Sequence, residues 1–401
     1  MIVRAQTVVS MEGEPIHDGA VAVSGSAIAD VGRFDEVRQR QSGEVLDLGD
    51  QVLMPGLING HCHLDYTMLR GAIPPQRSFS DWIRAINAEK AKLTEQDYID
   101  SIYAGFAEAR SFGTTTILNL IALPKLVAAI KEQPIKTWWF GELIDVRDPG
   151  GAERIADEAA EFLKPAGRWG LAPHAPFTAS PRLYARCEEI AHRENVPLTT
   201  HLAESPGEME MFRDASGAAF DFLKEIGRPM DDCGRETPLS RFLRTRTIDQ
   251  RWIIAHLNEL DAGDFDLLGA APKFHIAHCP RSHTFFGHAP FALERLRALG
   301  FNICLGTDSL ASNSSLSLFA EMRELLRKEP CLSPREALEM ATINGAAAIG
   351  QRNSLGCIRA GAQADLIALP LRRSNDVFEG IVSYAGAVSW MMVHGKITLF
   401  G

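Results

Sequence analysis

Eight short apolar runs, separated by longer amphipathic stretches, dominate the middle of this chain. Each run has the length of a buried β-strand, and the stretches between the runs have helical periodicity. This alternation favours parallel strands, which need a long crossover connection, usually a helix. Eight such units predict an α/β fold, a (β/α)8 TIM-like barrel, rather than an open doubly wound sheet. The predicted strands lie in residues 52–60, 114–120, 135–143, 169–175, 196–203, 251–257, 271–278 and 301–308.

The two ends of the chain differ from the middle. Residues 1–53 contain short β-branched or alternating segments that are broken by turns, and residues 354–401 have a similar pattern. We therefore expect both termini to pair into one small β-sandwich module. The barrel, residues 54–353, would then be inserted between the two halves of this module.

Composition excludes several kinds of partner. The formal net charge is −10 and the basic residues are scattered, which argues against nucleic acid. No apolar run approaches the roughly 18 residues that suggest a membrane span. The seven cysteines are widely spaced and form no CxxC pair, a pattern that favours reduced thiols in a cytoplasmic protein. No glycine-rich motif for binding nucleotide phosphates is present.

His61 and His63 follow the first apolar run. Residues i and i+2 of a strand point to the same side, so these two imidazoles can hold one cation. Cys62, which lies between them, would point away, and we do not expect it to be a ligand. An HxH pair alone is weak evidence for a metal site, so its position relative to other residues matters more.

Three other strand ends carry comparable residues: His201, His256 and Asp308, at the fifth, sixth and eighth runs. In a barrel, the C-terminal ends of the strands meet at one mouth. The alternative, that each is an unrelated core or surface residue, does not explain their recurrence at one kind of position. Three histidines and a carboxylate suit one divalent transition metal, zinc or iron. Such an ion lowers the pKa of water and supplies hydroxide.

More polar residues lie beside this predicted centre. Glu204, three residues after His201, could transfer protons without binding the metal, or it could be a solvated residue that starts the next helix. His174 ends the fourth run and is a candidate for substrate contact, with a structural role as the alternative. Arg281 and His283 follow the seventh run and could line a polar pocket.

As a set, the motifs resemble the amidohydrolase superfamily over nearly the whole chain. The similarity is greatest to the branch with cytosine, guanine, S-adenosylhomocysteine and aminodeoxyfutalosine deaminases and the triazine hydrolases. The motifs that carry it are MPGLINGHCHLDYTMLRG, APHAPFTAS, HLAESPGE, IIAH, HCPRSH, LGTDSLASNSSLSLFAEMR and GAQADLIAL.

The resemblance implies one divalent metal ion, with zinc favoured over iron, and four ligands: His61, His63, His201 and Asp308. It also implies three catalytic roles. Glu204 moves a proton from water to a ring nitrogen of the substrate, His256 orients the water, and Asp308 accepts a proton from it. Dinuclear relatives often carry a carboxylated lysine at the fourth strand. No lysine ends residues 169–175, which favours a single metal.

Two segments that face the substrate in the family depart from the familiar pattern. Many relatives have CPxSN where this chain has CPRSH at 279–283, and Gly71 is followed by AIPPQRSFSDWI instead of an acidic pair. With these segments included, the residues expected to contact substrate are His174, Trp82, Arg281 and His283.

The sequence therefore predicts a metal-dependent hydrolytic deaminase. Its expected substrate is a small heterocycle, purine-like or of the nucleoside type, with an aminodeoxyfutalosine-like compound as a specific candidate and ammonia as a product. The alternatives are a triazine-type hydrolase that releases chloride or amine, an amide- or ring-opening hydrolase, and a non-catalytic metal-bound protein. The resemblance also suggests a homodimer.

Overall fold

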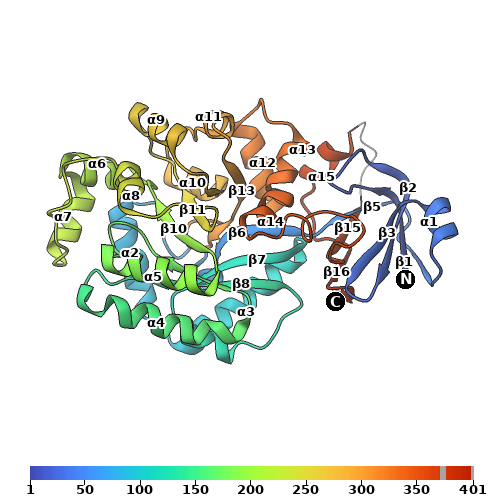
Figure 1. Ribbon diagram of the computed structural model, residues 1–401, viewed down its shortest axis with the longest axis horizontal. Helices are drawn as coiled ribbons and strands as arrows, with labels where there is room; N and C mark the ends of the chain where they lie inside the picture. Colours follow the sequence, from blue (N-terminus) through green and yellow to red (C-terminus); the bar gives the residue numbers. More distant parts are fainter. Residues whose placement is uncertain (371–375, 399–401) are drawn as a thin grey trace.

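The computed structural model describes residues 1–370 and 376–398, which form two sheets surrounded by helices (Figure 1). The sheet in the middle of the chain is parallel throughout, in the order β13-β12-β11-β10-β9-β8-β7-β6-β14. Its strands are β6 (Leu57–His63), β7 (Thr114–Ile121), β8 (Lys136–Leu143), β9 (Trp169–Pro173), β10 (Leu198–Leu202), β11 (Trp252–His256), β12 (His275–His278), β13 (Asn302–Leu305) and β14 (Asp308–Ser309).

The two ends of this sheet meet and close it into a barrel. After β13 the chain passes through Gly306 and Thr307 into β14, which pairs with β6. The Gly306 amide donates to the carbonyl of His278 at 2.9 Å, and the Thr307 amide donates to the carbonyl of His61 at 3.0 Å. The last strand is thereby joined to the first, and the predicted (β/α)8 barrel is confirmed.

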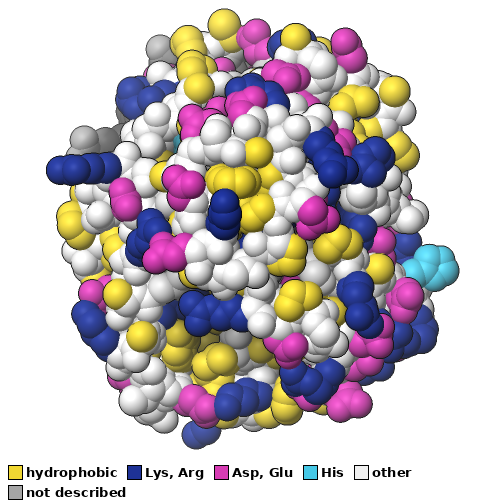
Figure 2. All heavy atoms as spheres, turned by 90° about the vertical axis from the view of Figure 1, so that its left-hand side faces the viewer, with side chains coloured by type: hydrophobic (Ala, Val, Ile, Leu, Met, Phe, Trp, Pro, Cys, Tyr) yellow, Lys and Arg dark blue, Asp and Glu magenta, His cyan; other side chains and the backbone are white. Residues whose placement is uncertain are grey.

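Helices surround the barrel (Figure 1). They are α2 (Phe79–Lys90), α3 (Glu95–Ser111), α4 (Ala152–Leu163), α5 (Pro181–Glu194), α6 (Pro206–Asp214), α7 (Gly217–Glu225), α8 (Pro238–Thr245), α9 (Ala262–Ala270), α10 (Pro280–Phe286), α11 (Leu293–Ala298), α12 (Leu318–Lys328), α13 (Pro334–Met340) and α14 (Ile343–Ala348). Within the described ranges, none of the helices is both long and apolar enough to cross a membrane. Acidic, basic and apolar side chains are intermixed on the face that Figure 2 shows.

The second sheet combines strands from both ends of the chain, in the order β17-β16-β15-β5-β1-β2-β3, with β4 beside β1. Its elements are β1 (Ile2–Val8), β2 (Ile16–Ser24), β3 (Ala27–Arg33), α1 (Phe34–Arg40), β4 (Val45–Asp47), β5 (Gln51–Pro55), β15 (Leu366–Pro370), α15 (Val377–Val382), β16 (Trp390–Val393) and β17 (Lys396–Thr398). The termini therefore pair as expected. Parts of the predicted C-terminal half, 371–375 and 399–401, lie outside the described residues, and the module boundaries remain predictions.

The first predicted barrel strand, residues 52–60, is divided between the two sheets. β5 ends at Pro55 in the second sheet, and β6 begins at Leu57 in the barrel. Gly56 lies between them, where a Cβ atom would come within 2.1 Å of the Thr115 side chain. The apolar pattern runs through this junction because both strands are buried, so the sequence alone did not reveal the change of sheet.

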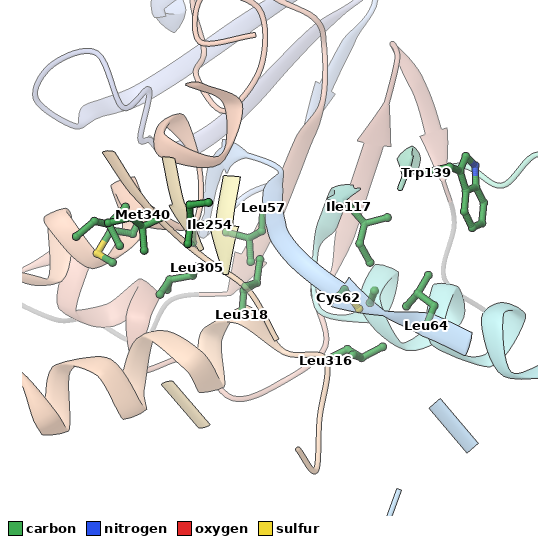
Figure 3. Close-up of a cluster of buried hydrophobic side chains, with 14 of the residues drawn as sticks. Leu57, Cys62, Leu64, Ile117, Trp139, Ile254, Leu305, Leu316, Leu318 and Met340 are labelled. Carbon is green, nitrogen blue, oxygen red and sulfur yellow. The ribbon is translucent and has the colours of Figure 1, made fainter. Parts of the chain in front are cut away.

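Neighbouring residues of the barrel strands pack into different hydrophobic clusters. Ile58 and Leu118 pack with Phe140 in a cluster built from successive barrel strands, which places it in the interior. Leu57 and Ile117, one residue earlier in each strand, belong to a larger cluster that includes side chains of the surrounding helices (Figure 3). The interior of the barrel is thus filled by side chains, and the polar residues gather at its mouth.

A buried ion pair joins the barrel to the second sheet. Lys136, the first residue of β8, is 5% exposed, and Asp365, which precedes β15, is 4% exposed. Their side chains form a salt bridge, and Asp365 also accepts a hydrogen bond from the His394 amide at 2.7 Å. Each charge is therefore compensated only while the two sheets stay in contact.

Replacing Lys136 should destabilise the fold. In Lys136→Met the carboxylate of Asp365 stays buried without its counter-ion, and we expect unfolding to cost about 3–5 kcal/mol less than in the wild type. Urea denaturation followed by circular dichroism measures this difference. Lys131→Met is the matched control, since Lys131 is exposed. A loss below about 1 kcal/mol in Lys136→Met would show that the pair matters little.

Candidate active site

Four imidazoles and one carboxylate meet at the C-terminal mouth of the barrel. His61 and His63 lie at the end of β6, His201 in β10, His256 at the end of β11 and Asp308 at the start of β14. None of the five is more than 6% exposed. The ring of His61 lies 5.1 Å from that of His63 and 5.0 Å from that of His201, measured between centroids. The residues that the sequence placed at one mouth therefore form one buried cluster.

An irregularity in β6 turns both of its histidines inward. Ile58 points into the barrel, and in a regular strand Cys62 would do so too. The pairing with β7 instead shifts register between Asn59 and Cys62. Cys62 packs in the outer cluster with Leu57 and Leu64 (Figure 3), so its predicted orientation away from the metal ligands is confirmed.

The ring nitrogens at this mouth lack partners within the described residues. Both nitrogens of His61, Nδ1 of His63 and Nε2 of His256 are buried without a hydrogen bond. Each buried, unpaired polar atom destabilises the folded protein by about 1–3 kcal/mol unless a ligand or ion binds it. The ligand atoms of His61, His63 and His201 lie within 4.8 Å of one another. Burial, followed by the nearby His201, lowers the pKa of His61 to about 3, which keeps its ring neutral, as metal binding requires. The residues therefore fit a divalent transition metal.

Asp308 adds a carboxylate to the three imidazoles. Its Oδ1 lies 3.9 Å from Nε2 of His61 and 3.7 Å from Nε2 of His63. Its Oδ2 accepts hydrogen bonds from the hydroxyls of Ser282 at 2.6 Å and Ser312 at 3.0 Å. Burial opposes ionisation, but the neighbouring imidazoles and the Ser282 hydroxyl bring the pKa of Asp308 below its usual range. The carboxylate is thus ionised and held in one orientation.

The backbone is strained at two of these positions. His256 has φ of 73° and Asp308 has φ of 56°, in the left-handed region that non-glycine residues rarely adopt. Each costs on the order of 1–3 kcal/mol, which the surrounding structure must offset. Strain of this size at a strand end is typical of functional sites.

Glu204 faces the same cluster from the loop after β10. Its Oε1 lies 3.6 Å from Nε2 of His256, and the side chain is buried. Burial first, and then the nearby Asp308, raises the pKa of Glu204 well above its usual value, so the carboxyl group readily holds a proton. Its amide donates to Oε2 of Glu208 at 2.9 Å, and its carbonyl accepts from Nδ2 of Asn258 at 3.1 Å.

These two supports of Glu204 were missed in the sequence. Glu208 follows Glu204 by four residues in HLAESPGE. At the start of a helix, that spacing could have indicated a carboxylate that accepts a hydrogen bond from the backbone amide of Glu204. Asn258 lies two residues after His256 and gave no comparable signal. Both residues fix the segment from which Glu204 projects.

A cavity of about 680 Å³ opens onto the cluster. His63, His201, His256, Asp308 and Glu204 lie at its floor. The rest of the lining includes apolar side chains (Phe79, Ile83, Phe177, Met211, Phe222 and Leu223) and charged ones (Lys90, Asp145, Arg147 and Asp148). His174 and Trp82, which the sequence predicts to contact substrate, line the cavity, and Nδ1 of His174 hydrogen bonds with the Thr178 hydroxyl at 2.5 Å. A small organic molecule would fit this volume.

Arg281 and His283 are not among the described residues that line this cavity. Both belong to α10, which begins directly after Cys279. The Arg281 amide donates to Oε2 of Glu321 at 2.9 Å, and its guanidinium donates to the Ser314 hydroxyl at 2.5 Å. The geometry therefore does not support their predicted contact with substrate. The residue of this segment that reaches the site is Ser282, through Asp308.

Glu142, near the end of β8, was missed. It lines the cavity, and its Oε1 lies 3.8 Å from Nδ1 of His63 and 4.0 Å from Nε2 of His174. Burial raises its pKa to about 7, and the positive charge of Lys90 partly opposes that effect. A single Glu in an apolar run has no motif spacing, so the sequence gave no reason to select it.

Comparison with known proteins gives consistent matches. The profile of the amidohydrolase family matches residues 52–398. Two curated relatives are named 5-methylthioadenosine/S-adenosylhomocysteine deaminase. The protein from Syntrophobacter fumaroxidans is 30% identical, over 97% of this chain and 90% of the relative. The protein from Nitratidesulfovibrio vulgaris is 31% identical, over 90% of this chain and 80% of the relative.

Solved structures agree in fold. An adenosine deaminase from Xanthomonas campestris with bound zinc matches with a TM-score of 0.84 and 26% identity, over 99% of this chain and 92% of that one. Aminofutalosine deaminase from Helicobacter pylori, in complex with methylthio-coformycin, has a TM-score of 0.89 and 21% identity, over 99% and 100% of the two chains. At that identity the second match supports the fold alone.

Removing one imidazole should abolish metal binding. We expect the wild type to hold about one divalent ion per chain. His61→Ala should retain far less through purification, because it loses one of the four predicted ligands and leaves a gap in a site whose geometry depends on all of them. Elemental analysis of the purified proteins measures the content. His192→Ala serves as control, since His192 is exposed on α5. Equal metal content in wild type and His61→Ala would refute the assignment.

The Ser282 hydroxyl should act through Asp308. Ser282→Ala removes one of the two hydroxyls that hold Oδ2, and we expect metal affinity to fall about 10–100-fold, as for other groups that orient a ligand. Competition with a chelator measures this. Ser314→Ala, a change in an exposed serine nearby, should have no effect. Unchanged affinity in Ser282→Ala would mean that Asp308 needs no such support.

Proposed function

The chain belongs to the amidohydrolase family, and from this we propose that it is a zinc-dependent hydrolytic deaminase acting on the amino group of a purine-like nucleoside. The observation that supports this most is the position of Glu204. Its carboxyl group lies 3.6 Å from His256 in the buried cavity that also holds the three histidines and Asp308. A site that only binds a metal has no need for a further buried carboxyl group beside the ligands.

The chemistry divides among these residues. A divalent ion held at the cluster supplies the Lewis acid that makes water nucleophilic. Asp308, ionised and fixed by two hydroxyls, accepts the proton that water loses. His256, the last residue of β11, orients the water. Glu204 gives a proton to the ring nitrogen as water adds to the carbon that bears the amine. Asp308 then gives its proton to the amine, and Glu204 takes the proton of the added hydroxyl. The carbon–nitrogen bond breaks, ammonia leaves, and a carbonyl group remains on the ring.

The relatives support both the metal and the reaction type. The adenosine deaminase from Xanthomonas campestris contains zinc, and the two curated relatives are named as deaminases of adenine nucleosides. The seven cysteines are all free, which is expected in a reducing compartment, so we propose a cytoplasmic location. A homodimer remains a prediction that light scattering can check.

Glu204→Gln should separate metal binding from turnover. The amide keeps the shape of the side chain but cannot exchange the proton, so we expect full zinc content and a fall in kcat of about 10²–10⁴-fold. Ammonia release from adenosine and 5-methylthioadenosine measures turnover. Glu210→Gln, an exposed change on α6, is the control. Wild-type turnover in Glu204→Gln would exclude the proton-transfer role.

The same assay tests the reaction class. The zinc-loaded protein should release ammonia from at least one amino-substituted purine nucleoside or futalosine-type compound. Release of chloride from a chlorotriazine, or formation of a carboxylate product from a cyclic amide, without ammonia from any nucleoside, would replace deamination with one of the other reactions of this fold.

A further inference from the structure

Glu142 lies on the wall of the candidate catalytic cavity, and the part of the chain that the structure describes offers its Oε1 atom no hydrogen bond. Its side chain is buried. Leaving a buried acceptor unpaired is costly, and more so for a charged one. The residue therefore needs a donor that comes from outside the protein.

The neighbouring imidazoles do not provide that donor. Nδ1 of His63 and Nε2 of His174 lie 3.8 and 4.0 Å from Oε1, beyond the roughly 3.2 Å of a hydrogen bond. The other nitrogen of His174 is already bonded to Thr178, which fixes its ring. Glu142 thus lies beside both rings without binding either.

A second metal ion is also a poor occupant. Glu142, His174 and His201 have ligand atoms within 4.8 Å of one another. However, Nδ1 of His201 donates to the carbonyl of His174 at 3.0 Å, which leaves only Nε2 free. That nitrogen has one lone pair, and it belongs to the cluster with His61 and His63. A second ion would have to take a ligand from the first.

The surrounding charges select the kind of donor. Lys90 lines the same cavity, with its ammonium 4.6 Å from the centre of the Tyr66 ring. Its positive charge already acts on Glu142, which reduces the attraction of this carboxyl group for a second cation. The ionised form of Glu142 would repel an anion. A neutral donor remains, and a vicinal diol offers two O–H groups to the two oxygens of one carboxylate. Because Glu142 is next to His63, that diol must be close to the reacting ring.

We propose that Glu142 recognises the substrate by accepting hydrogen bonds from the two hydroxyls of its ribose. This rests on the proposed nucleoside deaminase function and adds a specificity-determining residue to it. The apolar side chains of the cavity, with Phe79 and Phe222, then surround whatever the sugar carries at its far end.

The test compares adenosine with 2′,3′-dideoxyadenosine, which lacks both hydroxyls. In the wild type we expect kcat/KM to favour adenosine by about 10–100-fold, as for hydrogen bonds to a charged group. In Glu142→Ala that preference should shrink to about 3-fold or less, because adenosine is slowed and the dideoxynucleoside is not. Glu142→Gln, which preserves the volume and keeps one acceptor oxygen, should lie between them. Glu153→Ala, an exposed change on α4, should keep the wild-type preference.

Calorimetric binding of inosine and 2′,3′-dideoxyinosine provides a measurement that needs no turnover. A preference for inosine that disappears in Glu142→Ala supports the inference even if neither adenosine nor its analogue releases ammonia, an outcome that would reject only the deaminase proposal. The inference is overturned if Glu142→Ala retains the wild-type preference for the hydroxyls. It is equally overturned if Glu142→Gln and Glu142→Ala weaken zinc binding in chelator competition and slow both nucleosides equally, since Glu142 would then position His63.

Discussion

Closure of the barrel is the constraint on which the site depends. The Thr307 amide bonds to the carbonyl of His61, and this contact places Asp308, the next residue, beside the two histidines of β6. Residues almost 250 positions apart thereby meet in one buried cluster. The same geometry explains why His256 and Asp308 accept a left-handed backbone. Their strand ends must bend over the mouth, and the closed sheet holds them there.

Around this centre each functional carboxylate has its own support. Ser282 and Ser312 bind Asp308, while Glu208 binds the backbone of Glu204. Preorganisation of this kind lowers the cost of reaching the transition state, since no group has to turn when charge develops. Glu142 is the exception, because its partner has to arrive with the substrate. The cavity thus combines carboxylates that the protein already holds in place with one, Glu142, that we propose is paired only when substrate binds.

The sequence predicted the barrel and the five residues of its mouth because both follow from periodicity, and strand ends in a barrel converge. It could not reveal the break at Gly56, where two buried strands from different sheets form one apolar run. It did not reveal that α10 begins directly after Cys279, and in the structure Arg281 and His283 of this helix are not among the described residues that line the cavity. It gave no reason to select Glu142, because the functional interest of this carboxylate comes from its proximity to His63 and His174, which only the structure shows.

The junction at Gly56 has a consequence for how the chain is made. The strand that carries His61 and His63 continues directly into β5, and one neighbour of β5 is β15, near the C-terminus. During synthesis the ribosome therefore releases β5 early and its partner strand β15 late. Until residues 366–370 emerge, β5 has an open edge, and such edges invite pairing with other chains. The nascent protein is thus open to misassembly at β5, the strand directly before the one that carries His61 and His63.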